Sequence, residues 1–151
     1  MNRLSGNLTD YGSNWSFVQH VLAMDTIFPD ATIHFRAITS PWLQRVAYAL
    51  IIAVETLAAA LCCLGTWRLW RVRTAASATF HRAKRLGVPG IATGIATGML
   101  LWLAGFLAVG GEWFGMWMST QWSELESAFR FVVVLLIALV YLGQREEELD
   151  Q

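Results

Sequence analysis

The chain has 151 residues, of which 56% are hydrophobic and 15% charged, and its formal net charge is zero. Its length fits one domain, and its charged fraction lies well below the quarter that is usual for soluble domains. The zero net charge gives no indication of a nucleic-acid partner, and the adjacent Cys62 and Cys63 have neither zinc-site spacing nor the geometry to bridge each other. We therefore expect a single domain, residues 1–151, whose first partner is the lipid bilayer.

The first predicted element is an amphipathic helix over residues 14–26, inside a polar segment that covers residues 1–41. Its apolar side chains fall on one face at helical spacing, Asn14 or Ser13 is a suitable N-cap, and Pro29 follows its end. Such a helix lies on a membrane interface or caps a bundle. Asp25 falls on the apolar side, so either the helix ends before it or its carboxylate is buried with a partner, and the pattern favours the first.

Three apolar stretches follow, over residues 46–66, 88–110 and 128–143. A transmembrane helix needs roughly 20 apolar residues. The first stretch contains one charge, Glu55, the second contains none, and the third is shorter, with Arg130 near its start. A soluble core helix is the rival interpretation of the third stretch, but the rest of the chain offers too little polar surface for a soluble protein. The sequence predicts an all-α membrane protein, a bundle of three transmembrane helices with an amphipathic helix at one face.

The charges of the connecting segments predict the orientation. Residues 67–87 contain six basic and no acidic residues, whereas residues 111–127 contain three acidic and no basic residues. The positive-inside rule then places 67–87 and the tail 144–151 in the cytoplasm, and 1–41 and 111–127 on the outer side of the membrane. We expect the 67–87 segment to continue the first span as a helix before it turns back. Tryptophans mark both predicted interfaces: Trp67 and Trp70 inside, and Trp42, Trp113, Trp117 and Trp122 outside.

The second span repeats Gly-Ile-Ala-Thr and carries glycines on one helical face: Gly90, Gly94, Gly98 and, seven residues on, Gly105. The first three form two overlapping Gly-x-x-x-Gly motifs. In lipid, a stripe of this kind lets another backbone approach closely. A pore-lining role is disfavoured because threonine is the face's most polar residue. We expect the stripe to receive the first span or a further helix.

Glu55 is the acidic residue deepest in a predicted span, and an intramembrane acid is by default a candidate functional residue. The second span offers Thr97 and Trp102 as hydrogen-bond donors at matching depth. A protonated Glu55 could join the two helices, since desolvation raises a carboxyl pKa; the alternative is a proton or cation relay. A relay needs further ionisable groups along a path, and the second span has none, so the structural role is favoured.

A cluster of polar residues is predicted at the outer face of the membrane: Asp10, His20, Asp25, Glu112 and Arg130. The residue types suit a metal with nitrogen and oxygen ligands, but no two of them have a recognised ligand spacing. Arg130 has Glu126 four residues before it, in the favourable order for an ion pair. The histidines lie outside the spans, which argues against bundle-embedded haem, and no nucleophile or phosphate-binding motif is present. We predict neither a metal nor another cofactor, and no catalytic residue.

The sequence resembles a family of small bacterial integral membrane proteins catalogued as a domain of unknown function. The resemblance rests on Glu55 and on the runs "NLTDYGSNWSFVQHVLAMDT", "FRAITSP", "FHRAK", "GFLAVGGEWFGMW" and "AFRF". It implies a four-helix protein of mostly Gram-negative inner membranes with no assigned reaction. It also implies a hydrophobic helix before the first run, and only six residues precede Asn7, so we expect that helix to be missing here.

These features favour a non-enzymatic accessory or assembly subunit that packs against a membrane-protein partner or against its own copies. This hypothesis rests on the glycine face of the second span and on the tryptophan-rich periplasmic rim. The alternative is a small transporter, or an ion- or proton-conducting protein, that uses Glu55. An enzyme or metal protein at the periplasmic face is a third and weaker hypothesis.

Overall fold

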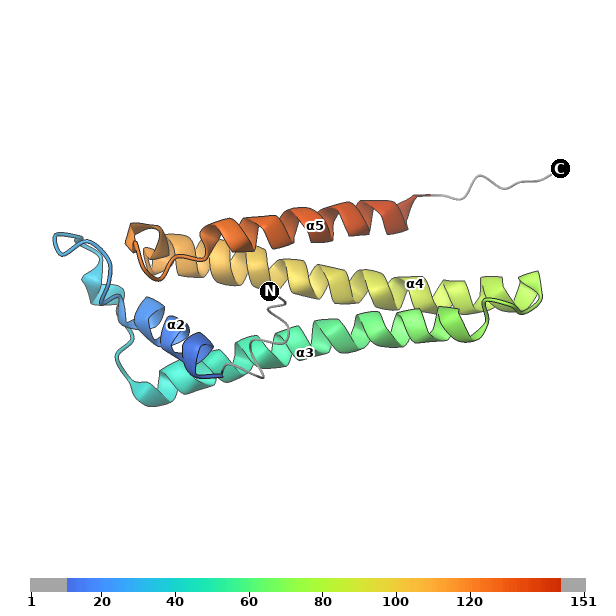
Figure 1. The fold of residues 1–151 in the computed structure, drawn as a ribbon, viewed down its shortest axis with the longest axis horizontal. Helices are drawn as coiled ribbons and strands as arrows, with labels where there is room; N and C mark the ends of the chain where they lie inside the picture. The colour runs from blue at the N-terminus through green and yellow to red at the C-terminus, as the bar shows by residue number, and fades with distance from the viewer. Residues whose placement is uncertain (1–10, 145–151) are drawn as a thin grey trace.

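The computed structural model describes residues 11–144, and every regular element within that range is helical (Figure 1). Three of the helices are long and apolar enough to cross a bilayer: Pro41–Arg71, Ser77–Trp113 and Leu125–Gly143. The predicted all-α fold with three candidate membrane spans is therefore confirmed. In chain order the elements are α2 (Tyr11–Ala23), the 3₁₀ helix η1 (His34–Arg36), α3 (Pro41–Arg71), α4 (Ser77–Leu100), the π-helix η2 (Leu101–Trp113), the 3₁₀ helix η3 (Met116–Met118) and α5 (Leu125–Gly143).

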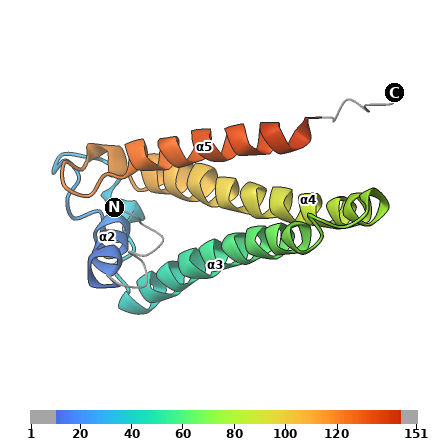
Figure 2. The ribbon, with the colours of Figure 1, turned by 45° about the vertical axis from the view of Figure 1, so that its right-hand side comes forward.

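The three long helices form a layer with α4 in the middle. α3 packs along α4 on one side, and α5 packs on the other side against α4 and η2. Figures 1 and 2 show that α3 and the α4–η2 helix lie close together where the chain turns from one to the other and diverge toward their opposite ends. The short helix α2 lies in the widened part, against α3.

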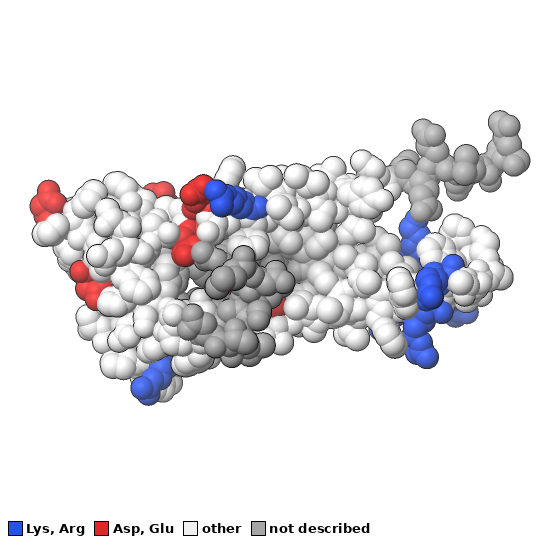
Figure 3. Space-filling model, in the orientation of Figure 1, with Lys and Arg blue, Asp and Glu red and all other residues white. Residues whose placement is uncertain are grey.

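Charges separate along this layer (Figure 3). Basic residues gather where α3 passes into α4, which we call the basic end: Arg68, Arg71, Arg73, Arg82, Lys84 and Arg85. Acidic residues lie toward the other end, where α2, η1, η3 and the segments that join them form what we call the cap. The buried apolar core of the described residues lies within this cap, around Met24, Ile27 and Phe114.

Two predicted boundaries are wrong. The amphipathic helix expected at 14–26 runs from Tyr11 to Ala23, because Met24 adopts a positive φ of 53° and ends it. Asp25 consequently lies beyond the helix end, which was the favoured alternative. The predicted continuation of the first span as a helix into 67–87 is confirmed, since α3 runs to Arg71, but the loop bounds are wrong, because only residues 72–76 interrupt the helices. Arg and Lys are good helix formers, so both helices continue past the apolar stretches.

The second and third spans also differ from their predicted bounds. The second is continuous from Ser77 to Trp113, with Pro89 inside α4. From Leu101 onward it is a π-helix, and the N–H of Phe114 still donates to the carbonyl of Val109, five residues back, at 3.0 Å. The third begins at Leu125, three residues before the predicted Ala128. The segment predicted as 111–127 is shortened from both sides.

Candidate functional site

The closest contact between the spans is a backbone contact, the glycine seam, formed by Gly65 of α3 with Gly87 and Gly94 of α4. A Cβ built at Gly94 would lie 2.6 Å from Cys62 Sγ and 2.7 Å from the carbonyl oxygen of Ala58. One built at Gly65 would lie 2.7 Å from the carbonyl oxygen of Gly87. Neither carbonyl can move without disturbing its helix, so glycine is required on both sides of the seam.

The predicted glycines contribute unequally to this packing. A Cβ at Gly90 would meet nothing closer than the Leu61 carbonyl oxygen at 3.9 Å, and one at Gly98 would contact Leu135 of α5 at 3.4 Å. Gly105 lies beyond the seam, where a Cβ would meet only Leu101 of its own helix, at 3.5 Å. The stripe therefore faces α3, the first of the two neighbours expected from the sequence, over only part of its length.

Sequence reasoning missed Gly65 and Gly87. Gly87 precedes Gly94 by seven residues, so it continues the same helical face and could have been found by extending the stripe backwards. Gly65 is the single glycine of its span, and nothing in its neighbourhood distinguishes it from a helix-ending glycine. A search for complementary small residues on the first span would have indicated it.

Glu55 is half-buried in α3, seven residues before Cys62 and so on the side of the helix that carries the seam. The donors expected from the second span point elsewhere. Thr97 donates to the carbonyl of Thr93 in its own helix, at 2.8 Å, as threonine in a helix often does. Trp102 stacks on Phe131 of α5, with ring centroids 4.7 Å apart. The structure therefore does not join α3 to the second span through these two side chains.

The predicted polar cluster is brought together only in part. His20 Nδ1 lies 2.8 Å from Asp25 Oδ2, and the His20 ring stacks on Trp122 at 4.7 Å. Arg130 pairs instead with Glu126 of its own helix on an exposed surface. The remaining members are Glu112, which is exposed, and Asp10, which lies outside the described residues. Within residues 11–144, no three His, Cys, Asp or Glu side chains are close enough to share a metal ion.

The cap is joined to the end of the second span by polar contacts that the sequence did not predict. Ser119 Oγ lies 2.9 Å from the Thr26 hydroxyl and accepts from the backbone N–H of Trp122 at 3.0 Å. Arg36 donates to the carbonyl of Trp113 at 3.2 Å, and its guanidinium lies 4.5 Å from the centre of that ring. These contacts join irregular segments with no periodic pattern, which explains why pattern reasoning did not find them.

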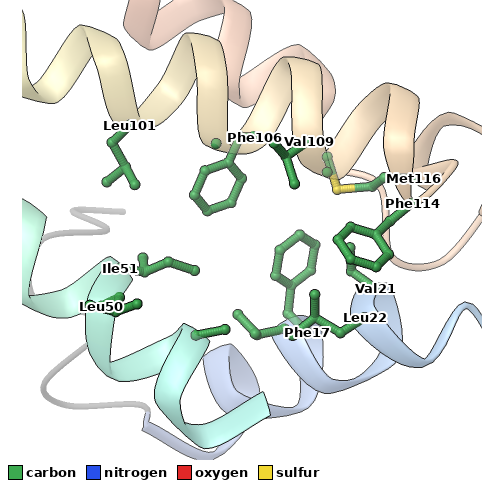
Figure 4. A pocket seen from close by; sticks show the side chains of 14 residues that line it. Phe17, Val21, Leu22, Leu50, Ile51, Leu101, Phe106, Val109, Phe114 and Met116 are labelled. Carbon is green, nitrogen blue, oxygen red and sulfur yellow. The ribbon is translucent and has the colours of Figure 1, made fainter. Parts of the chain in front are cut away.

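A cavity of about 250 Å³ lies beneath the cap, between α2, α3 and η2 (Figure 4). Phe17 of α2, Ile51 of α3 and Phe106 of η2 point into it from three sides. All its lining residues are apolar or glycine: Phe17, Val18, Val21, Leu22, Ala47, Leu50, Ile51, Leu101, Gly105, Phe106, Val109, Gly110, Phe114 and Met116.

Long apolar helices and a seam built on backbone contact together define an integral membrane protein of the helical-bundle class. Residues 3–145 match the profile of the family DUF2165, described as a predicted small integral membrane protein, and the chain belongs to that family. This confirms the family expected from the sequence. No curated protein and no solved structure matches the chain significantly.

Proposed function

We propose that this protein is a non-catalytic subunit of the bacterial inner membrane that packs through α3 against a second membrane-protein chain or a second copy of itself. One observation carries the proposal: α3 exposes a continuous line of small side chains at helical spacing. We call it the alanine face of α3, and it comprises Ala49, Ala53, Thr56, Ala60 and Cys63, all of which are exposed.

The alanine face lies opposite the glycine seam. Ala58 faces the seam, because its carbonyl oxygen lies beside Gly94. Ala60 follows Ala58 by two positions, which is roughly 200° around an α-helix. The Thr56 hydroxyl donates to the carbonyl of Ile52 at 2.7 Å, so this residue has no need of an external acceptor. Apolar surface alone does not drive helix association in lipid, whereas small residues do so by allowing close backbone contact. The α3–α4 pair already uses this chemistry on one side of α3, and the alanine face supports the same use on the other.

The basic end supports an orientation for this subunit. Its six Lys and Arg residues would face the cytoplasm by the positive-inside rule, and the cap would then face the periplasm. α5 runs from the cap toward the basic end (Figure 1), so the proposed orientation puts the C-terminus in the cytoplasm. Cysteine accessibility to a membrane-impermeant reagent, at Arg73→Cys and at Thr120→Cys in a Cys62→Ser, Cys63→Ser background, tests it.

Ala60→Leu tests the packing proposal directly. The larger side chain would block close approach at the alanine face. We expect light scattering in mild detergent to show a complex for the wild type and a monomer for Ala60→Leu. Ala104→Leu makes the same change on an exposed position of η2 and should leave the complex intact. A wild-type protein that is monomeric in native membranes, as judged by crosslinking through the exposed Cys63, would overturn the proposal.

A transporter that uses Glu55 is the second candidate, because Glu55 is a half-buried carboxyl roughly 21 Å from the start of α3 at 1.5 Å per residue. The candidate requires proton or cation flux into proteoliposomes that Glu55→Gln abolishes. Equal flux from the wild type and Glu55→Gln would eliminate it, and the packing proposal does not depend on the result.

A further inference from the structure

The cavity beneath the cap is a partly open space between α2, α3 and η2 that the side chains of the described residues do not fill. Two glycines, Gly105 and Gly110, form part of its wall on η2. They are five residues apart, and a π-helix, with its hydrogen bonds from residue i to i+5, brings such positions to the same side. The π-helix therefore aligns two positions that carry no side chain beside the cavity.

Water does not suit this cavity. A buried water needs two to four polar partners, and none of the described residues that line the cavity has a polar side chain. Empty space is also unfavourable, because lining atoms without neighbours lose their dispersion contacts. The chemistry of the cavity selects a hydrocarbon occupant.

The cavity opens toward the surface that would meet lipid. Leu50 and Val109 line it, yet Leu50 is 60% exposed and Val109 is 49% exposed. Leu50 lies nine residues into α3, roughly 14 Å from Pro41 along the helix, which is a depth occupied by lipid chains in a hydrocarbon core of about 30 Å. Bilayer hydrocarbon thus reaches the opening directly.

We propose that one acyl chain of a bilayer phospholipid occupies this cavity and completes the contact between α2, α3 and η2. A volume of about 250 Å³ lies below the roughly 300–1,000 Å³ of sites for drug-sized ligands, so the cavity has room for the end of one acyl chain, whose remainder stays in the bilayer. The lipid then takes the place of protein side chains where α3 and the second span diverge. This site is distinct from the proposed alanine face, which lies on the other side of α3.

An alanine of α3 and one of η2 provide a matched test. Ala47 lines the cavity, whereas Ala108 of η2 is exposed and does not. Full-length protein is reconstituted in vesicles of isotope-labelled phosphatidylcholine and phosphatidylglycerol, exchanged into mild detergent and measured by native mass spectrometry. We expect the wild type and Ala108→Phe to retain one labelled phospholipid, and Ala47→Phe to retain at least about tenfold less, equivalent to about 1.4 kcal/mol of binding free energy.

A second measurement needs no variant. A phospholipid with a diazirine at the end of one chain is photolysed in the same vesicles, and we expect labelling at Phe106 to exceed that at Val134, which is 63% exposed on α5. Labelling at Phe106 equal to or below that at Val134 would overturn the proposal. Equal lipid retention by Ala47→Phe and Ala108→Phe would do so too, as would a retained free fatty acid, a retained detergent or a second copy crosslinked in the cavity.

Discussion

The two ends of the pair formed by α3 and the second span pack in opposite ways. At the glycine seam the two backbones touch, and a single added methyl at Gly94 would lie within 2.7 Å of a carbonyl oxygen. Seven residues further on, the same helix face carries Leu101, whose side chain borders a cavity of about 250 Å³. At the seam, glycines allow the two helices to touch. At the cavity, glycines of η2 leave a space between the helices.

Glycine therefore has two different roles on one stripe, and its neighbour decides which. Gly94 faces a straight stretch of α3 and allows contact, whereas Gly105 faces the point where α2 separates α3 from the second span. A Gly-x-x-x-Gly motif predicts close packing only where the partner helix remains parallel to it. The following substitutions probe the difference between the two ends, from the largest expected effect to the smallest.

Gly94→Ala should have the largest effect, because its new methyl meets the backbone of α3. We expect a loss of about 1–3 kcal/mol of unfolding free energy, typical of overpacking, measured by titration with sodium dodecyl sulfate. Gly90→Ala is the matched control, since its nearest atom is 3.9 Å away; it should be neutral, or stabilising by up to about 1 kcal/mol through helix propensity. Equal losses in both variants would mean that the seam is not a backbone contact.

Ser119→Ala should destabilise the cap by about 1–2 kcal/mol, because two hydrogen bonds meet at the Ser119 hydroxyl, which is buried. Thermal unfolding followed by near-ultraviolet circular dichroism measures the loss. Ser123→Ala, at an exposed position nearby, should change stability by less than about 0.5 kcal/mol. A Ser119→Ala protein as stable as this control would show that the cap is held by its apolar core alone.

Arg36→Ala should cost about 1 kcal/mol, the usual size of a partly desolvated cation–π contact, since the guanidinium covers the ring of Trp113. In a variant that keeps Trp113 as its single tryptophan, the emission of that residue should also change, because its ring loses the guanidinium that covers it. Arg45→Ala removes an exposed arginine from the start of α3 and should change neither quantity. An unchanged spectrum in Arg36→Ala would contradict the contact.

Arg130→Ala should have the smallest effect. Its ion pair with Glu126 is exposed, with side-chain exposures of 72% and 80%, and such pairs contribute at most about 0.5 kcal/mol within a helix. Any difference from the wild type should vanish in about 1 M salt, where the Debye length is roughly 3 Å. A loss above about 1 kcal/mol that persists at high salt would instead indicate a buried role for Arg130.

The spans could be predicted from the sequence because their signal is compositional. Long apolar runs specify helices in lipid irrespective of how the rest of the chain folds. The same reasoning misplaced the helix ends. Residues 77–87 are polar enough to look like a loop, yet polar residues with good helix propensity extend a helix that has already begun. The end of α2 depends on one residue, Met24, whose positive φ no pattern foretells.

The candidate site was less predictable, since it depends on how the helices diverge. The seam could be anticipated from Gly94, and its partner Gly65 only by a search for small residues on the first span. The cavity has no sequence signal, because it exists only where α2 enters between the ends of α3 and the second span that lie far apart in the chain. Contacts such as Thr26 with Ser119 connect irregular segments, and no periodicity relates them.

The position of α2 has a consequence for how the protein is made. Thr26 and Ser119, the hydrogen-bonded pair that joins the α2 side of the cap to its other half, are 93 residues apart in the chain. At roughly 5–20 residues per second of synthesis, the ribosome needs about 5–20 s after Thr26 to reach Ser119. During that interval α2 and the residues after it have been made, while η2, Phe114 and Ser119 have not. The cap therefore closes only after α3 and α4 have had time to meet at their glycines.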